Sequence, residues 1–228
     1  MLNKTTYKDQ VIAFLYGQLR RGELSPGDKV LEVPLAKLLQ ISRAPIREAL
    51  TQMVGDGLFV CRPQVGTFVA SLSADEIVDA YVTRGLLEGF SVASALHDFT
   101  ASDYQRLGHY CSEMEVLASK HEQLELIELG RDFHTFLFQR CGNCQLIEYT
   151  QRLSSKLHLL FYKHWASLYS PVELRTRHEK LLSIMQTGNA TQVELVFRAH
   201  YLETGQKVAE LYRQKQKAEE SKHGECTA

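Results

Sequence analysis

Residues 42–50 read SRAPIREAL, which places Arg43 and Arg47 four positions apart around a proline. On a helix, side chains four residues apart project from one face, about one turn from each other. Pro45 would fall in the first turn, where its missing N–H is tolerated. Ser42 is a residue type that caps helix N-termini. The stretch therefore predicts a helix that starts after Ser42 and presents two guanidinium groups on one face.

The segments on both sides of this stretch predict two more helices and a β-hairpin. Upstream, apolar residues recur with helical spacing, and a tight connection at Gln40-Ile41 separates the second and third helices. Downstream, LFVC and GTFVA indicate short strands joined by RPQV. The expected bounds are 4–21, 34–39 and 42–54 for the helices, and 58–61 and 66–70 for the strands. Two helices joined by a tight turn and followed by a hairpin describe a winged helix-turn-helix, whose second motif helix enters the major groove of DNA.

This arrangement suggests a role for the two arginines. At the N-terminal end of a recognition helix, an arginine can hydrogen-bond guanine O6 and N7 together. An isolated Arg-x-x-x-Arg pair is more often a solvated basic face, but the turn before this pair and the hairpin after it favour DNA binding. Gly66 would let the hairpin backbone approach phosphates or the minor groove. The expected DNA-binding residues are Ser42, Arg43, Arg47, Arg62 and Gly66.

Charge and histidine content change at about residue 72. Residues 1–72 hold nine Lys/Arg and six Asp/Glu, a formal charge of +3, whereas residues 73–228 hold 17 and 21, a formal charge of -4. All nine histidines lie in the second segment. We therefore expect two domains with different partners, 1–72 and 73–228.

The second segment has helical spacing of its apolar residues and no strand alternation. Its first helical pattern, residues 73–96, opens with the capping-box pair Ser73 and Glu76. Further helical patterns cover about residues 102–119, 122–140, 144–168, 171–187 and 190–217. The expected fold class is mainly α, with an N-terminal winged helix-turn-helix and a C-terminal antiparallel, all-helical bundle.

Composition excludes several classes of protein. No run reaches the ~18 consecutive apolar residues of a membrane span, and the N-terminus is too polar for a signal peptide, which indicates a cytoplasmic protein. Cys141 and Cys144 form a lone CxxC, without the second pair of a zinc ribbon or the βαβ context of a thioredoxin-like site. Gly142-Asn143 between them indicates instead a helix end followed by a new helix.

The stretch GDKVLEVPLAKLLQISRAPIREALTQMVGDGLFVCRPQVGTFV, residues 27–69, resembles the DNA-binding domain of GntR-family bacterial transcription regulators. The resemblance implies that Arg43 and Arg47 read bases and contact phosphates, and that Gly66 marks the tip of the wing. Many relatives carry a third DNA-contacting arginine where this chain has Val33. The operator is therefore expected to depart from the family's usual palindrome.

Three stretches of the second segment resemble the FCD ligand-binding domain of the FadR-type branch: VTRGLLEGFS, DFHTFLF followed by CGN, and RHEKLLSIMQTGNATQVELVFRAHYL. The resemblance implies an antiparallel helical bundle that binds a small organic acid, often beside a divalent metal held by one Asp and three His. The positions that match the three histidines are His134, His178 and His200, whose neutral imidazoles would suit Zn²⁺ or Ni²⁺. The alternative for a histidine on an apolar face is a satisfied core residue.

The fourth metal ligand departs from this family pattern. The family's Asp precedes the first histidine by one helical turn, and this chain has Gly130 there. Asp132 is two residues before His134, about 200° round the helix, and cannot take over. Two arrangements stay open: three histidines hold a metal together with water and effector, or they hold the effector directly.

Arg84 and Glu88 form a second polar pair within an apolar stripe. An i,i+4 surface salt bridge is one interpretation. By resemblance, Arg84 occupies a position that often faces the cavity, where it would clamp a carboxylate. Tyr81 and Glu88 are further candidates for the same cavity.

The leading hypothesis is a transcription regulator, not an enzyme, whose binding to DNA responds to a small carboxylate. Because one winged helix reads few bases, we expect a homodimer on a palindromic operator. A metal-dependent hydrolase is one alternative, since three histidines leave an open metal position; against it, the sequence places no carboxylate beside them as a general base. A constitutive DNA-binding protein with an inert dimerisation bundle is the other.

Overall fold

The structure is a computed structural model, and it describes residues 5–165 and 168–225. Contacts divide the chain into two compact units, Met1–Leu72 with Lys156–Leu160, and Ser73–Ser155 with Phe161–Ala228. Each unit is described by itself below. The expected division into domains at 1–72 and 73–228 remains a prediction about which parts fold independently.

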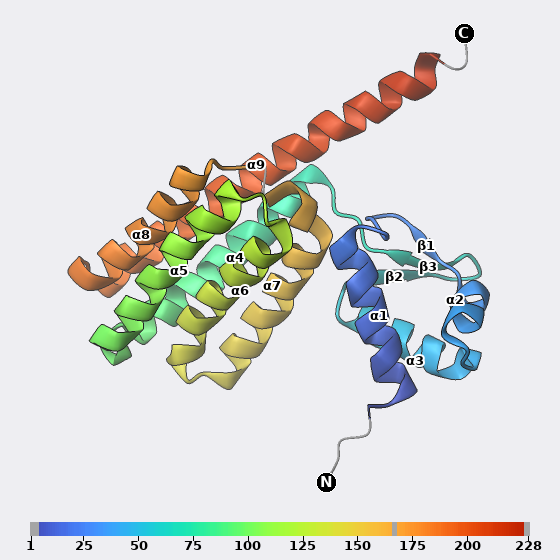
Figure 1. Ribbon diagram of the computed structural model, residues 1–228, viewed down its shortest axis with the longest axis horizontal. Coiled ribbons are helices and arrows are strands. Elements are labelled where there is room, and N and C mark those ends of the chain that lie inside the picture. Colours follow the sequence, from blue (N-terminus) through green and yellow to red (C-terminus); the bar gives the residue numbers. More distant parts are fainter. Residues whose placement is uncertain (1–4, 166–167, 226–228) are drawn as a thin grey trace. The chain divides into compact units, whose positions relative to one another are not determined.

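The N-terminal unit is a winged helix-turn-helix (Figure 1). Its elements are α1 (Tyr7–Arg21), β1 (Lys29–Val30), α2 (Glu32–Leu39), α3 (Arg43–Gly55), β2 (Phe59–Arg62) and β3 (Gly66–Val69). Helices and sheet share one apolar core, whose buried side chains include Val11, Leu15, Leu19, Leu35, Ile46, Leu50, Met53, Phe59 and Val69. The tight connection between α2 and α3 contains Gln40, which has a positive φ of 54°.

Two details next to the recognition helix α3 differ from the sequence prediction. Helix α2 begins at Glu32 rather than Pro34, because a proline in the first turn lacks only an N–H that has no helical partner there. Ser42 is the N-cap residue of α3, but its side chain makes no capping hydrogen bond. The predicted cap position is therefore confirmed, but the Ser42 hydroxyl accepts no hydrogen bond from the helix. The physical reason is Pro45, which occupies the third helical position and has no N–H to donate.

The wing is a three-stranded antiparallel sheet in the order β1-β3-β2. Strands β2 and β3 form the predicted hairpin, with Arg62 opposite Gly66. Strand β1 is absent from the sequence prediction, because two residues are too few to show an alternation. Gly66 has a φ of +133°, and a Cβ there would lie 2.8 Å from Lys29 Cε. The Lys29 side chain is flexible and could move, so it is the positive φ that favours glycine at this position of the wing.

The second unit is a helical bundle, and its described residues contain no strand. Its helices are α4 (Ala74–Ser94), α5 (Ala101–Ser119), α6 (Gln123–Phe138), α7 (Cys144–Trp165, apart from Lys156–Leu160), α8 (Pro171–Thr187) and α9 (Ala190–Glu225), with short 3-10 helices at Leu96–Asp98 and Gln139–Cys141. Capping boxes start three of them, at Ser73 with Glu76, Thr100 with Asp103, and Ser170 with Glu173. The predicted fold class, mainly α with a winged helix-turn-helix before a helical bundle, is confirmed.

Some predicted helix ends differ from the structure. Helix α9 runs to Glu225, past the expected end at 217. Lys4 and residues 166–167, which the predicted helices include, lie outside the described residues. Between Cys141 and Cys144, Gly142 has a φ of 63° and separates the 3-10 turn from α7, which is the helix end and restart that the sequence indicates. None of the described helices has both the length and the apolar character that a membrane span needs.

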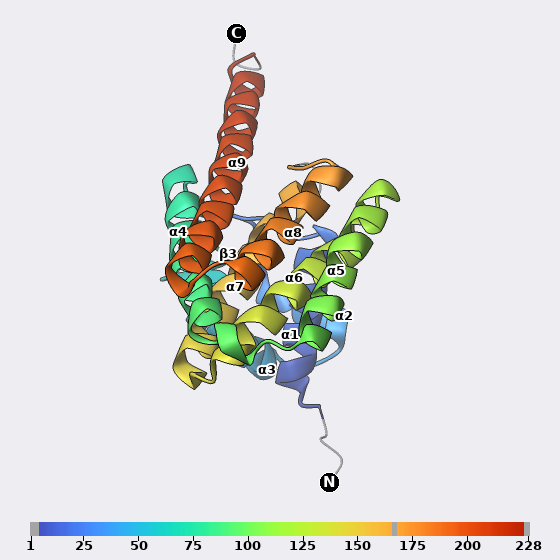
Figure 2. The same cartoon turned by 90° about the vertical axis from the view of Figure 1, so that its left-hand side faces the viewer.

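Helices α4 and α9 lie side by side in both views of the bundle (Figures 1 and 2). Glycines permit this close approach. A Cβ on Gly85 would lie 3.1 Å from Tyr201 Cβ, and a Cβ on Gly205 would lie 2.6 Å from Tyr81 Cβ. The contact brings α4 against the part of α9 that carries His200 and Tyr201.

Candidate functional site

Three histidines from three helices meet inside the bundle: His134 on α6, His178 on α8 and His200 on α9. One ring nitrogen of each lies within 4.8 Å of those of the other two. Their ring centroids are 5.4, 5.4 and 5.3 Å apart. Tetrahedral zinc with bonds of about 2.1 Å needs nitrogens about 3.4 Å apart, so small side-chain rotations would bring this set to bonding distance.

The environment keeps all three imidazoles neutral at pH 7. Burial lowers the pKa of His178 to about 4. Burial, reinforced by the charge of Arg84, holds the pKa of His134 well below its usual range. The pKa of His200 is also well below its usual range, because burial and the two neighbouring histidines disfavour its protonated form. Neutral imidazole is the form that binds a metal ion.

Hydrogen bonds orient two of the rings. The Leu174 carbonyl lies 2.7 Å from His178 Nδ1, so this nitrogen carries the proton and Nε2 keeps its lone pair. Glu88 Oε1 lies 2.5 Å from His134 Nδ1. Metal-ligating histidines commonly donate their second ring N–H to a carbonyl or a carboxylate. The donor set therefore fits Zn²⁺ or Ni²⁺.

Neither candidate position for a fourth ligand, Gly130 or Asp132, provides an acidic side chain at the histidines. Gly130 is buried one turn before His134, and a Cβ there would meet nothing within 4 Å. Asp132 points elsewhere, because its carboxylate accepts from Arg131 Nη2 at 3.0 Å and is 55% exposed. Neither residue supplies an acidic ligand to the histidines.

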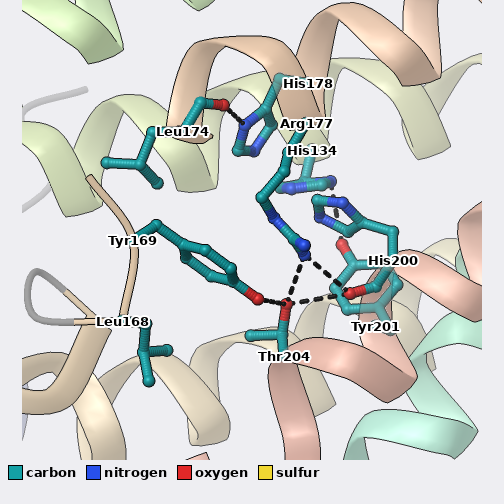
Figure 3. Close-up of a pocket in the computed structure, with 9 residues that line it drawn as sticks. All are labelled: His134, Leu168, Tyr169, Leu174, Arg177, His178, His200, Tyr201 and Thr204. Atoms are coloured by element: carbon teal, nitrogen blue, oxygen red, sulfur yellow. Dashed lines mark hydrogen bonds between the residues drawn. The ribbon is translucent and has the colours of Figure 1, made fainter. Parts of the chain in front are cut away.

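A small cavity of about 40 Å³ borders the histidines and has space for a few water molecules (Figure 3). The residues that line it are His134, Leu168, Tyr169, Leu174, Arg177, His178, His200, Tyr201 and Thr204. In Figure 3, Tyr169 and Leu168 lie across the cavity from His200. Among the described residues no Asp or Glu lines it, and the polar lining consists of a guanidinium, hydroxyls and imidazoles.

Sequence reasoning missed four polar residues of this lining: Tyr169, Arg177, Tyr201 and Thr204. Arg177 Nη2 donates to the Thr204 hydroxyl and to the His200 carbonyl, each at 3.1 Å. Its guanidinium carbon lies 4.0 Å from the centre of the Tyr169 ring. The only available signals were the adjacency of Arg177 to His178 and that of Tyr201 to His200. Tyr169 and Thr204 carry none, because only the tertiary fold brings them here.

The three residues predicted to bind effector, Tyr81, Arg84 and Glu88, are fully buried and do not line the cavity. The interpretation of Arg84 and Glu88 as a surface salt bridge is wrong, because neither side chain has any exposed area. The same i,i+4 spacing occurs on buried and exposed helix faces, so spacing alone cannot distinguish them.

Arg84 has an unusual buried environment. Its Nε lies 3.6 Å from Glu88 Oε2, and its guanidinium carbon lies 4.6 Å from the centre of the Tyr201 ring. None of its guanidinium nitrogens has a hydrogen-bond partner within the described residues. Burial raises the pKa of Glu88 to about 7, although Arg84 and the Tyr201 hydroxyl oppose this rise. Tyr201, which lines the cavity, therefore connects it to Arg84.

The DNA-binding candidates lie on the surface of the N-terminal unit. Arg43 and Arg47 project from α3 with side chains 51% and 60% exposed. Both donate to one carboxylate, that of Glu32 at the start of α2. Ser42 is exposed beside them, and Val33 is 46% exposed on α2.

The wing adds a basic residue that sequence reasoning missed. The Arg62 guanidinium carbon lies 4.6 Å from the centre of the Phe68 ring, and Lys29 Nζ lies 5.7 Å from the same centre. Lys29 also lies against Gly66. Pairing of β1 with β3 places Lys29 beside the hairpin. Sequence reasoning missed this lysine because it did not predict the two-residue strand β1.

Comparisons with known proteins assign both units to families. Residues 7–69 match the bacterial regulatory proteins of the gntR family. Residues 79–203 match the FCD domain. The HTH-type transcriptional repressor GlaR of Escherichia coli (strain K12) is 28% identical over 197 residues, which span 83% of this chain and 90% of that protein.

Solved structures share the fold. Escherichia coli McbR/YncC superposes with a TM-score of 0.71 at 24% identity, over 92% of this chain and 99% of that chain. A GntR transcriptional regulator from Rhodococcus sp. RHA1 also has a TM-score of 0.71, at 18% identity, over 88% and 96% of the two chains. Because the FCD match alone spans more than half of the sequence, this chain belongs to the GntR family of bacterial transcription regulators and carries an FCD domain.

Proposed function

We propose that this regulator binds a palindromic operator through α3 and the wing, and that a small carboxylate in the histidine cavity controls this binding. The observation that carries the proposal is the combination of two features in one chain: an exposed arginine pair on a recognition helix, and a buried cavity lined by Arg177 and three neutral imidazoles. The name of the relative GlaR, a transcriptional repressor, supports repression as the mode of action. The site of action is then the chromosome, in the cytoplasm.

A carboxylate fits the chemistry of the cavity. A buried anion needs charge-assisted hydrogen bonds to offset the loss of its hydration. Arg177, whose Nη1 pairs with Glu203 outside the lining, supplies a cation at the wall, with the hydroxyls of Tyr169 and Thr204 beside it. Within the part of the chain that the structure describes, no acidic side chain lines the cavity to repel an anion. Its volume of about 40 Å³ favours a small ligand.

The three histidines would hold a divalent ion such as Zn²⁺ or Ni²⁺, which would attract a carboxylate oxygen to its open coordination position. This chain's residues prepare the site. The Leu174 carbonyl and Glu88 hold two of the rings by Nδ1, and Gly130 leaves space for water or effector in place of the family's Asp.

A second copy of the chain would complete the DNA-binding unit. Helix α4 exposes Val82, Leu86 and Phe90, at spacings of four residues, by 38, 41 and 52%. Such a row of exposed apolar side chains is typical of an interaction surface. We propose that two copies meet at this row, so that their two recognition helices read the two halves of a palindrome.

Selection of DNA from a randomised duplex library tests the DNA-binding role. Wild-type protein should enrich a palindromic duplex, and Arg43→Ala and Arg47→Ala should each weaken binding to it by about 1–3 kcal/mol. Lys180→Ala, which removes an exposed charge from α8, is the matched control and should bind as wild type does. Equal binding by all of these proteins would exclude α3 as the recognition helix.

Two alternatives are separable by experiment. A hydrolase would need a carboxylate as general base beside the histidines. Glu88 is hydrogen-bonded to His134, but it is buried and does not line the cavity, which disfavours this role. Turnover assays with added Zn²⁺ test this alternative. A constitutive DNA-binding protein would show no rise in melting temperature with any of a panel of small carboxylates, whereas a ligand-responsive regulator would show one.

A further inference from the structure

One carboxylate oxygen joins the two arginines of the recognition helix. Glu32 Oε2 accepts hydrogen bonds from Arg43 Nε and Nη2 at 3.2 and 2.6 Å, and from Arg47 Nε at 2.9 Å. Glu32 is the first residue of α2. The contact therefore links the two helices of the helix-turn-helix at the surface that carries the predicted base-reading side chains.

The contact leaves a defined edge of each guanidinium group free. A guanidinium has five N–H donors in a planar fork. Glu32 takes the Nε side of Arg43 and of Arg47, so the terminal edge formed by Nη1 and Nη2 keeps an N–H on each nitrogen. Two N–H groups on one edge are what a bidentate contact to guanine O6 and N7 requires. Glu32 thus orients both forks with their terminal edges away from itself.

The contact also changes the charge that DNA meets. The hydrogen bonds from Arg43 and Arg47 hold the pKa of Glu32 below its usual range, so the carboxylate is ionised at neutral pH. Two arginines and one carboxylate carry a net charge of +1 instead of +2. Sequence-independent affinity for DNA comes from cations that neutralise phosphates. A carboxylate at this surface therefore weakens nonspecific binding.

We propose that Glu32 is a specificity-determining residue, which raises the ratio of operator binding to nonspecific binding by orienting the two arginine forks and cancelling one of their charges. This role rests on the proposed function, because it requires that α3 reads DNA. A role in folding is small by comparison, since exposed ion pairs contribute little to stability. The side chains of Glu32, Arg43 and Arg47 are 29, 51 and 60% exposed.

The test compares Glu32→Gln with Glu48→Gln. Glu48 is an exposed carboxylate on α3, and no ion pair to either arginine occurs among the described contacts. Both variants remove one negative charge from the DNA-binding motif. The probes are the duplex that wild-type protein enriches from the random library and a scrambled duplex of the same composition. Affinities for both are measured over a range of salt concentrations.

We expect Glu32→Gln to bind the scrambled duplex more tightly than wild type does, with a salt dependence steeper by about one ion. The specificity ratio, which is the affinity for the enriched duplex divided by that for the scrambled one, should fall about tenfold. Glu48→Gln should keep that ratio within about twofold of wild type. Glu32→Asp keeps the charge but shortens the side chain by one methylene. It should also lower the ratio, because the shorter carboxylate cannot hold both forks in the same orientation.

The outcomes are distinct. Wild-type enrichment followed by an equal specificity ratio in Glu32→Gln and Glu48→Gln would overturn the role of Glu32 while leaving the proposed function in place. Wild-type protein that enriches no duplex would overturn DNA reading by α3, and the role of Glu32 with it. A ratio that falls in Glu32→Gln but stays at the wild-type value in Glu32→Asp would assign the effect to charge and overturn the orienting role.

Discussion

Glu88 Oε1 lies 2.5 Å from His134 Nδ1, and both side chains are shielded from solvent. The Tyr201 hydroxyl donates to the other carboxylate oxygen at 2.6 Å and so fixes its orientation. With Nδ1 occupied, His134 has only Nε2 to offer to an ion held with His178 and His200. Glu88 would therefore not bind the proposed metal itself but would orient one of its ligands, His134.

This relationship predicts the effect of Glu88→Gln. Removal of such an outer carboxylate typically costs 10–100-fold in metal affinity, so zinc should bind this variant about 10–100-fold more weakly than wild type. Competition with a fluorescent chelator measures the affinity. The control is Glu113→Gln, which removes an exposed carboxylate 3.6 Å from His109 Nε2. Equal zinc affinities of the two variants would contradict the role of Glu88.

Gly130→Asp should tighten metal binding. The position is buried one turn before His134, and a Cβ there meets no atom within 4 Å, so an aspartate side chain has space to add a fourth ligand. We expect zinc affinity to rise at least about tenfold. Gly108→Asp, at a helical glycine of α5 with equal space around it, should leave the affinity unchanged.

Metal analysis after equilibration with micromolar Zn²⁺ or Ni²⁺ provides the baseline for these variants. Wild-type protein that stays metal-free under these conditions would contradict the three-histidine site itself. Gly130→Asp with wild-type affinity would instead contradict only the placement of the fourth ligand.

The fold was largely predictable because its signals are local. SRAPIREAL has an apolar period and an early proline that together specify α3, and Gly66 with its flanking strands specifies the hairpin. The predictions that failed concern features that depend on tertiary structure or that are too short to show a sequence pattern. Strand β1 is only two residues long and becomes visible through its pairing with β3. The absence of a capping hydrogen bond to the Ser42 hydroxyl follows from Pro45 being the third residue of the helix.

The site was predictable only in part for a similar reason. The three histidine positions came from a family resemblance, and the structure brings them together. The burial of Arg84 was not predictable, because the i,i+4 spacing to Glu88 is the same on a surface helix. Arg177 lies at the cavity wall because α8 packs on α9. The spacing of apolar residues in the sequence does not predict that contact.

Close packing of α4 on α9 predicts the effect of Gly205→Ala. The new Cβ would lie 2.6 Å from Tyr81 Cβ, and overpacking of this kind typically costs about 1–3 kcal/mol. Gly108→Ala has no atom within 4 Å of its Cβ and should gain about 0.5–1 kcal/mol from helix propensity. Urea unfolding of both variants measures the difference. Equal free energies of unfolding would contradict the close approach of the helices.

The exposed row on α4 predicts the effect of Leu86→Glu. A charge at this position would have to be buried without a partner in the proposed dimer, which is costly. We expect wild type to sediment as a dimer at micromolar concentration and the variant to sediment as a monomer that has lost affinity for the palindromic duplex. Val116→Glu, at a 48% exposed position of α5, is the control. Dimeric Leu86→Glu would place the interface elsewhere.

The last prediction separates effector binding from the response to it. Arg177 lines the cavity, so Arg177→Gln should raise the carboxylate concentration needed for half of the thermal shift by about tenfold or more, as expected for loss of a charge-assisted hydrogen bond. Arg84 is on α4 and contacts the ring of Tyr201, which lines the cavity from α9. Helix α4 follows the wing after residues 70–73. Arg84→Ala should therefore abolish the effect of the carboxylate on DNA binding, while binding without effector stays close to wild type.

The physical basis is that an effector shifts an equilibrium only by its difference in affinity for two arrangements, typically about 1–3 kcal/mol of coupling. Arg84→Ala should remain folded, because Glu88 already has a pKa of about 7 and can take up a proton when its cationic neighbour is lost. DNA-binding titrations with and without the carboxylate measure the coupling. If Arg84→Ala responds at the same carboxylate concentration as wild type, Arg84 serves only to pack against Tyr201 and to pair with Glu88.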